Sequence, residues 1–290
     1  MNRGKMIIGK WSGNKYYILE KIGQGEIGTV YKVRDDNGNI MALKISKEIA
    51  SITREYNIMK KFKKIQFVPN VYDVDDYLDK NTRYYFFTMD YIEGKNLKYV
   101  MKNGHISLKN ILGLARILLN ILNELNKIGY IYTDIKLENI FINKTSNEII
   151  LVDYGSIIKK GDTIKEYTPT YNMTCWGFNY NPQENIIFSI TMIMVAIIFK
   201  KELSPSNRSI TEVVKMIRYS NLDYRMKKLL IDGLKLNYSG LKDYDYRLKD
   251  VILSINHKYN KKNIDGIEIF FISSICIFVL VIIIGINNIV

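Results

Sequence analysis

The chain has 290 residues, a length that fits two regions of one enzyme or two small domains. Hydrophobic residues make up 47% of it, which is enough for a sizeable core, and two cysteines, Cys175 and Cys276, exclude a disulfide or cysteine–metal framework. The formal net charge of +13 predicts an acidic partner such as nucleic acid, anionic lipid or an acidic substrate. Residues 1–13 hold only a short apolar patch, Met6–Ile8, and therefore predict no secretory signal peptide.

The first third of the chain has the pattern of strands. Residues 16–47 contain strand-like apolar segments, and the run Asp-Asp-Asn-Gly-Asn at 35–39 is a strong turn signal. Residues 51–64 are charged and periodic, which predicts a helix. Further strands are predicted at residues 70–76 and 83–90.

The rest of the chain has the pattern of helices. Leucine and isoleucine recur at helical spacing over residues 107–127, and Gly129 follows as a helix-ending residue. After Asp153 the chain is mostly helical, and the apolar run at 186–199 predicts a buried helix, because 14 residues are too few to cross a bilayer. Strands first and helices second predict an α+β architecture of two lobes.

A glycine-rich turn, Gly23-x-Gly25-x-x-Gly28-x-Val30, lies between two predicted strands. Glycines there let backbone amides approach phosphate oxygens without a side-chain clash. Such spacing also occurs in ordinary hairpins, so the turn alone says little. The strand lysine that follows, Lys44, makes it more specific, and the strand after the third glycine argues against a dinucleotide-binding fold, in which a helix begins there.

The segment from Tyr132 to Asn139 is the most informative part of the sequence. Asp134 can accept the proton of an attacking hydroxyl, and Lys136 can neutralise charge on a moving phosphoryl group. Asn139 and Asp153 are oxygen ligands suited to Mg2+. Together these residues provide what is needed to transfer a phosphoryl group from a magnesium nucleotide to a hydroxyl.

This pattern, D-x-K-x-x-N followed by D-Y-G in place of D-F-G, resembles the catalytic and metal-binding loops of eukaryotic-like (Hanks-type) serine/threonine protein kinases. The resemblance covers about residues 16–255. It implies a β-rich lobe over residues 1–92 with the glycine turn and the strand lysine, and a helical lobe over residues 93–263 with the catalytic loop. It also implies ATP with Mg2+, or Mn2+ as an alternative, and protein substrates phosphorylated on serine or threonine.

Within this resemblance, Lys44 takes the place of the lysine that holds the α- and β-phosphates. Its expected partner is Glu55 on the helix that follows, because Glu48, the second choice, lies too close to the strand end to be in the middle of that helix. The nucleotide site implied by the family comprises the glycine turn and Lys44–Glu55, with Met89 behind the adenine, the backbone of Asp90 to Ile92 along its edge, and Ile22, Val30 and Ala42 among the lining residues.

The sequence departs from the family pattern beside the catalytic aspartate. Tyr132 and Thr133 replace the usual His-Arg, whose arginine binds a phosphorylated activation loop, so the active state is expected to depend less on loop phosphorylation. Thr168-Pro169-Thr170-Tyr171 resembles the substrate-docking loop, in which Thr168 is expected to hydrogen-bond Asp134 and Lys136.

Two further family features are missing. Asn172 to Cys175 stand where A-P-E is expected, and no aspartate opens the helix at 186–199. Arg247 looks like the arginine that pairs with the missing glutamate. A buried arginine without a partner would be costly, so either Glu184 substitutes for that glutamate or Arg247 is exposed.

The C-terminal region predicts a membrane anchor. Residues 269–290 form a run of 22 residues without a charge, enough to cross about 30 Å of hydrocarbon as a helix. Lys258, Lys261 and Lys262 precede the run and no lysine or arginine follows it, which predicts a single-pass protein of the cell membrane, anchored by residues 264–290, with its kinase region in the cytoplasm. This organisation resembles short membrane-anchored kinases of spore-forming bacteria.

Other partners and functions stay open. Residues 225–262 hold ten lysines and arginines against four acidic residues, and this surface fits anionic lipid or DNA, or is simply a solvated surface. A homodimer is a further option. Two alternatives to a protein kinase remain, a pseudokinase scaffold at the membrane and a small-molecule phosphotransferase on the same fold.

Overall fold

The computed structural model describes residues 2–25, 28–63, 67–146, 148–164 and 167–259. They fold as two compact units. The first unit comprises residues 1–94 together with two later segments, 143–145 and 150–157, and the second comprises the remaining residues. The predicted membrane anchor, residues 264–290, lies outside the described residues.

The first unit is built on one antiparallel sheet with the strand order β1-β2-β3-β4-β6-β5. Its strands are β1 (Met6–Ile8), β2 (Lys15–Gln24), β3 (Thr29–Asp35), β4 (Ile40–Ser46), β5 (Val71–Asp79) and β6 (Thr82–Asp90). Strands were predicted in each of these regions except Met6–Ile8, where only an apolar patch was noted. Their inward residues form one core, with Ile7, Val33, Leu43 and Phe86 fully buried.

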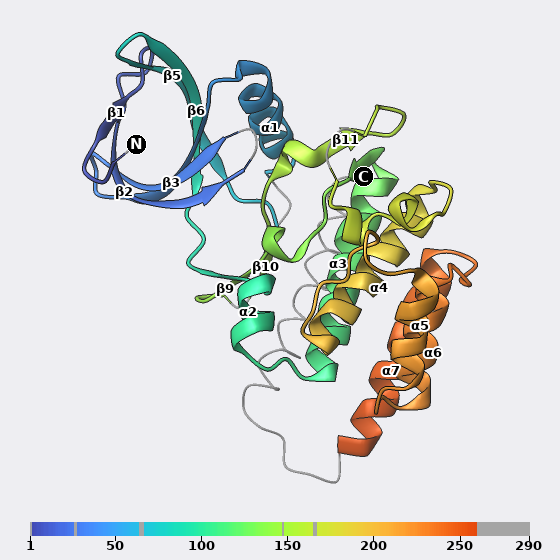
Figure 1. Ribbon diagram of the computed structural model, residues 1–290. Coiled ribbons are helices and arrows are strands. Elements are labelled where there is room, and N and C mark those ends of the chain that lie inside the picture. Colours follow the sequence, from blue (N-terminus) through green and yellow to red (C-terminus); the bar gives the residue numbers. More distant parts are fainter. Residues whose placement is uncertain (1, 26–27, 64–66, 147, 165–166, 260–290) are drawn as a thin grey trace, which may run out of the picture. The chain divides into compact units, whose positions relative to one another are not determined.

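The six-stranded sheet is curled, so that its first strand, β1, lies next to its last strand, β5 (Figure 1). The Lys10 amide donates to the carbonyl of Asp76 at 2.9 Å. The buried carboxylate of Asp75 accepts hydrogen bonds from the amides of Trp11 and Ser12 and from the Ser12 hydroxyl, at 2.7 to 3.2 Å. The edge of β5 is thereby covered, which protects its unpaired backbone groups.

Helix α1 (Ile49–Lys61) belongs to the same unit and is amphipathic. Its buried residues are Ser51, Ile52, Glu55 and Met59, which recur at the spacing of one helical face. A glutamate among apolar residues on this face is unusual, because a buried carboxylate is costly unless it is paired. Glu55 therefore points to a charged partner inside the unit.

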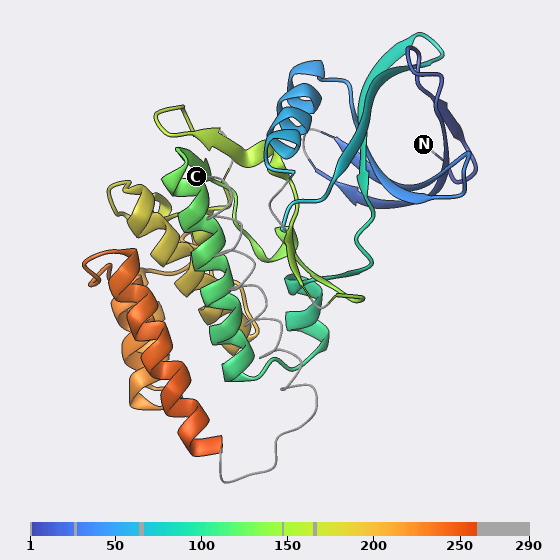
Figure 2. The same cartoon turned by 180° about the vertical axis from the view of Figure 1, so that it is seen from behind.

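The second unit is mainly helical. Its helices are α2 (Leu97–Asn103), α3 (Leu108–Lys127), α4 (Pro182–Phe199), α5 (Ile210–Arg218), α6 (Tyr224–Leu234) and α7 (Leu241–Tyr259). Helices α3, α4 and α7 run side by side in both views (Figures 1 and 2). Helix α3 begins at its N-cap Ser107, as the leucine and isoleucine pattern predicts.

Short strands and single turns complete the chain. Strands β7 (Gly94–Asn96), β9 (Ile140–Asn143) and β10 (Ile149–Leu151) form a sheet in the order β10-β9-β7, and β8 (Tyr130–Tyr132) pairs with β11 (Ile157–Lys159). The 3-10 turns are η1 (Leu137–Asn139), η2 (Tyr154–Ser156), η3 (Pro169–Tyr171) and η4 (Met173–Trp176). They were not predicted, because elements of three or four residues leave no periodic pattern in a sequence.

Helix α4 is the central apolar helix of the second unit. It begins at Pro182, four residues before the predicted start, because the Asn181 side chain caps the amides of Gln183 and Glu184. Among the described residues it is the one helix long and apolar enough to cross a membrane, but 72% of it is buried inside the protein. This burial confirms the predicted core helix.

Candidate active site

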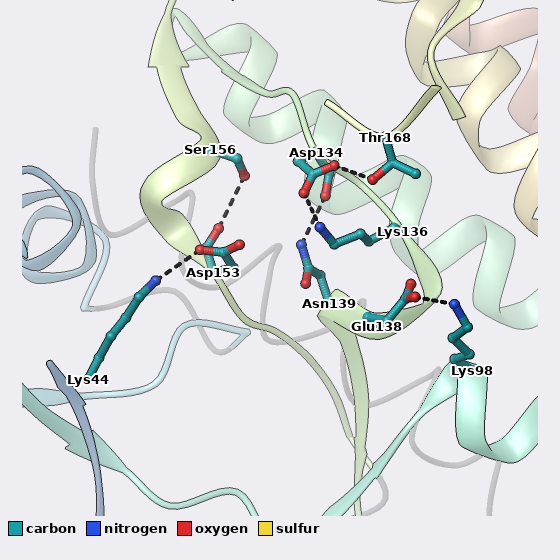
Figure 3. Close-up of polar contacts among 9 residues, drawn as sticks. All are labelled: Lys44, Lys98, Asp134, Lys136, Glu138, Asn139, Asp153, Ser156 and Thr168. Carbon is teal, nitrogen blue, oxygen red and sulfur yellow. Dashed lines mark hydrogen bonds and ion pairs between the residues drawn. The ribbon is translucent and has the colours of Figure 1, made fainter. Parts of the chain in front are cut away.

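The first unit brings together the predicted lysine, its glutamate and the aspartate of D-Y-G. Lys44 on β4 places its Nζ 2.6 Å from Glu55 Oε2 and 3.0 Å from Asp153 Oδ1. The Lys44–Asp153 pair is drawn in Figure 3. The predicted Lys44–Glu55 pair is therefore present, whereas Glu48 lies exposed at the start of α1.

The electrostatics of this cluster follow from burial and pairing. Burial by itself would lower the pKa of Lys44, but the carboxylates of Glu55 and Asp153 outweigh it, raise the pKa and keep the lysine charged. Burial raises the pKa of Glu55, which is 2% exposed, while Lys44 and the amide of Tyr154 act in the opposite direction. A cation held by two carboxylates in one buried place is suited to hold phosphate oxygens.

Asp153 sits in an unusual backbone conformation. Its φ of 65° and ψ of 64° lie in the left-handed region, which aspartate tolerates better than most residues. The Ser156 hydroxyl donates to the Asp153 carbonyl at 3.1 Å (Figure 3). The turn η2 therefore begins directly after the metal-binding candidate and helps to hold it.

The glycine turn is partly described, since residues 26 and 27 lie outside the described residues. The Gly25 amide donates to the Gly28 carbonyl at 2.9 Å. A Cβ atom at Gly28 would lie 2.7 Å from the carbonyl oxygen of Ile45, so this position needs glycine because β4 approaches closely. At Gly23 and Gly25 added Cβ atoms would meet only ordinary contacts, so packing within the unit does not explain these two glycines.

The predicted adenine-site residues lie on neighbouring strands of the same unit. Val30 is opposite Lys44, and Ala42 is opposite Met89. The Asp90 amide donates to the Asn70 carbonyl at 3.0 Å, and the Asp90 carboxylate accepts from the Asn70 amide at 2.9 Å. Asp90 therefore already has structural partners, and Ile22 is 43% exposed.

The second unit carries the catalytic-loop residues. The Asp134 carboxylate is nearly buried and accepts two hydrogen bonds, from the Thr168 hydroxyl at 2.6 Å and from Lys136. Figure 3 shows these two side chains reaching the carboxylate. The predicted Thr168–Asp134 bond is thus present, and no hydrogen bond between Thr168 and Lys136 is recorded among the described residues.

Asn139 has a fixed orientation. Its side-chain nitrogen donates to the Asp134 carbonyl at 3.0 Å, so its amide oxygen is directed elsewhere (Figure 3). An amide oxygen here and a carboxylate at Asp153 are hard donors of the kind that Mg2+ prefers. Within the described ranges, no group of three or more His, Cys, Asp or Glu side chains is placed to hold a metal ion.

Several anchoring residues were missed from the sequence. Asn185 of α4 accepts the Met173 amide at 3.0 Å, and the Ser189 hydroxyl donates to the Tyr171 carbonyl at 2.6 Å. The segment after Thr168 is therefore tied to α4 without the aspartate that the family pattern places there. The buried polar residues in an otherwise apolar helix were the available signal.

A second missed network surrounds Glu138. Lys98 of α2 pairs with Glu138 and lies 2.8 Å from Glu202, which also accepts a hydrogen bond from the Tyr171 hydroxyl. The hydrogen bonds to Glu138 and Glu202 raise the pKa of Lys98. These residues come from four separate segments, so no local motif announced them.

Arg247 has an ordinary environment. Its Nε lies 3.9 Å from Asp243 one turn earlier in α7, and its side chain is 49% exposed. Of the two alternatives, exposure is therefore the one observed, and no buried arginine lacks a partner at this position.

Comparisons with known proteins agree with this geometry. Residues 16–264 match the family model described as the protein kinase domain. The chain is 35% identical over 245 residues to serine/threonine-protein kinase YabT of Bacillus subtilis, and the matched region covers 82% of this chain and 71% of that protein. It is 34% identical over 190 residues to a probable serine/threonine-protein kinase of Clostridium acetobutylicum, covering 61% of this chain and 27% of the relative. A similar relative from Clostridium perfringens is 31% identical over 160 residues, covering 51% of this chain and 22% of its own length.

Proposed function

Because the chain belongs to the protein kinase family and is a serine/threonine protein kinase, we propose that it transfers the γ-phosphoryl group of Mg2+-ATP to protein hydroxyls at a membrane. The observation that carries the chemistry is the bond from the Thr168 hydroxyl to Asp134 at 2.6 Å. In this bond a threonine hydroxyl, the same chemical group that a serine/threonine kinase phosphorylates, donates to the carboxylate of the proposed base. A general base must reach the proton it removes at such a distance.

In this proposal Asp134 accepts the proton of the substrate hydroxyl as the oxygen attacks the γ-phosphorus, while the bond from that phosphorus to the β–γ bridging oxygen breaks and ADP leaves. Lys136, already beside that carboxylate, neutralises charge on the moving phosphoryl group. Lys44, oriented by Glu55, holds the α- and β-phosphates. The adenine would bind along Asp90 to Ile92 through backbone groups other than the Asp90 amide, because that amide donates to Asn70.

We propose Asp153 and Asn139 as the residues that hold Mg2+, with Mn2+ as a substitute that takes the same oxygen donors. The bound ion would neutralise charge on the phosphate oxygens. The chain's own contribution is to fix the donors in place. Ser156 holds the Asp153 backbone, and the Asp134 carbonyl sets the orientation of the Asn139 amide.

The test uses the full chain in detergent, as wild type and as Asp134→Asn, with labelled ATP and Mg2+. Incorporation of phosphate on serine or threonine by the wild type alone supports the proposal. Binding of ATP without incorporation points to a pseudokinase. Turnover of a metabolite without phosphorylated protein points to a small-molecule phosphotransferase.

We also propose that the kinase is anchored in the cell membrane by residues 264–290, with its catalytic region in the cytoplasm. The proposal is supported by the run of 22 uncharged residues and by Lys258, Lys261 and Lys262 before it. Removing residues 264–290 should release the protein from the membrane fraction into the soluble fraction. Retention of the shortened chain in the membrane fraction would contradict the anchor.

The basic surface at residues 225–262 fits anionic lipid better than DNA. Four of its seven lysines and arginines between 225 and 249 pair with acidic residues: Arg225 with Asp250, Lys228 with Asp232, Arg247 with Asp243 and Lys249 with Asp245. The neck before the anchor holds Lys258, Lys261 and Lys262 with no acidic residue between 251 and 262, and each lysine near anionic headgroups contributes about 1 kcal/mol. Flotation of the chain lacking residues 264–290 with anionic but not neutral vesicles supports lipid, and binding to DNA instead would overturn this choice.

A further inference from the structure

One carbonyl group of the first unit accepts two hydrogen bonds from the segment that carries Asp153. The carbonyl oxygen of Phe67 accepts the Leu151 amide at 3.2 Å and the Tyr154 hydroxyl at 2.7 Å. Leu151 precedes Asp153 by two residues and Tyr154 follows it directly. The two hydrogen bonds therefore hold the chain on both sides of the aspartate.

Tyr154 is well placed to act as a rigid support. Its side chain is 1% exposed, and its hydroxyl donates to the Phe67 carbonyl at 2.7 Å. The amide of Tyr154 also hydrogen-bonds to Glu55, the partner of Lys44. One residue thus contacts both the anchoring carbonyl and the carboxylate that orients the lysine.

The hydroxyl also makes other arrangements of the turn less favourable. If Asp153 left the left-handed conformation and the turn moved away, the buried Tyr154 hydroxyl would have to leave its partner. A buried donor that loses its acceptor is costly, more so than the net gain from making the bond. The phenylalanine that the family pattern has at this position carries no such hydroxyl.

A phosphate on the activation segment has no arginine beside the catalytic aspartate to bind, since Thr133 stands there and is buried. We propose that Tyr154 is a positioning residue that replaces this form of control: its bond to Phe67 holds Asp153 beside Lys44, ready to bind the metal, without a phosphorylated loop. The inference rests on the proposed function, because it assigns Asp153 to the metal. It concerns the first unit alone, in which Lys44, Glu55, Phe67 and Tyr154 all lie.

The decisive variant is Tyr154→Phe, which removes one oxygen atom and restores the usual family residue. Tyr244→Phe is the matched control, because Tyr244 is equally buried and its hydroxyl lies 2.9 Å from that of Thr191 in the second unit. Each variant is made in the full chain in detergent. Amide hydrogen exchange over residues 151–157 and the Mg2+ dependence of ADP binding are measured for both.

We expect Tyr154→Phe to speed exchange in this segment and to raise the Mg2+ concentration for half-maximal ADP binding about tenfold, as for loss of one buried hydrogen bond. In assays of phosphate transfer, KM for the protein substrate should not change. Tyr244→Phe should leave exchange at 151–157 and the Mg2+ dependence as in the wild type. Equal behaviour of Tyr154→Phe and wild type, or the same shift in both variants, would overturn the inference.

Phosphatase treatment tests whether the turn is held in place without a phosphorylated loop. Wild-type protein treated with phosphatase should keep its Mg2+ dependence, and a shift as large as that of Tyr154→Phe would mean that a phosphate, not Tyr154, holds the turn. Failure of the proposed function looks different: the wild type itself would transfer no phosphate. The exchange measurement would still report whether Tyr154 holds the turn.

Discussion

The two sets of functional side chains are assembled in different ways. In the first unit, Lys44, Glu55 and Asp153 come from a strand, a helix and a turn, and the lysine and the aspartate are 109 residues apart in sequence. In the second unit, Asp134, Lys136 and Asn139 lie within one short loop, and only Thr168 comes from farther away, 34 residues along the chain. The first set therefore depends on the packing of a whole sheet and helix, whereas the second depends mostly on one loop.

This difference implies a division of effects. Changes in the first set should weaken nucleotide binding, because its charges are proposed to hold phosphate oxygens. Changes in the second set should slow the transfer step, because its carboxylate faces the hydroxyl.

The largest effect is expected for Asp134→Asn. The variant keeps the shape of the side chain but loses the base, so kcat should fall by about 10²–10⁴-fold. Affinity for ATP should stay within about twofold, measured by calorimetry beside the kinetics. A loss of ATP affinity as large as the loss of kcat would break the proposed separation of the two sets.

Glu55→Gln should have the next largest effect. It removes the charge that orients Lys44, and a hydrogen bond to a charged group contributes about 1.5–3 kcal/mol, so the affinity for ATP should fall roughly 10- to 100-fold. Glu48→Gln is the matched control at the exposed start of the same helix and should bind ATP as the wild type does. Equal losses in both variants would show that the net charge of α1, not the pair, matters.

Thr168→Ala tests the one distant member of the second set. Loss of its hydroxyl bond to Asp134 should lower kcat/KM for a protein substrate about tenfold, while Lys136 still contacts the carboxylate. Thr168→Ser keeps the hydroxyl and should retain most of the activity. If the serine variant were as slow as the alanine variant, the methyl group rather than the hydrogen bond would be responsible.

Asp75→Asn tests how much the stability of the sheet that carries Lys44 depends on the buried carboxylate of Asp75. Burial would raise the pKa of Asp75, but the hydrogen bonds from Ser12, Asp76 and Trp11 outweigh it and lower the pKa. The charged form therefore stabilises the fold above the ordinary carboxyl pKa of about 4, and this contribution is lost as the pH falls through the lowered native value.

We expect the asparagine variant to be less stable by about 1–3 kcal/mol at pH 7, and the gap to the wild type to shrink in acid. Urea unfolding at several pH values measures both. A gap that does not change with pH would mean that the carboxylate charge contributes nothing.

Arg247→Ala should have the smallest effect. Its ion pair within α7 is exposed and long, so the free energy of unfolding should change by less than about 0.5 kcal/mol. Kinase activity should match the wild type. A large loss of activity would show that this position keeps the role that the family pattern gives it despite the missing A-P-E.

Much of the architecture could be predicted from periodicity and turn residues. The strands around the glycine turn, helix α3 and the buried helix α4 follow from patterns within a few turns of chain. Strand β1 could not be predicted this way, because its three residues form a strand only when they pair with Lys15 to Tyr17. The 3-10 turns and the short strands β7, β8 and β9 were missed because elements of three or four residues leave no periodic pattern.

The sequence alone determined which residues are proposed to carry the chemistry, since Asp134, Lys136, Asn139 and Asp153 stand at fixed spacing in short motifs. It also pointed to Glu55 as the partner of Lys44. The tertiary structure decided what supports these residues: the attachment of Tyr154 to Phe67, the ties of Asn185 and Ser189 to the segment after Thr168, and the exposure of Arg247. The physical reason is that local spacing fixes which groups share a loop. Burial and hydrogen bonds between distant segments exist only once the chain has packed.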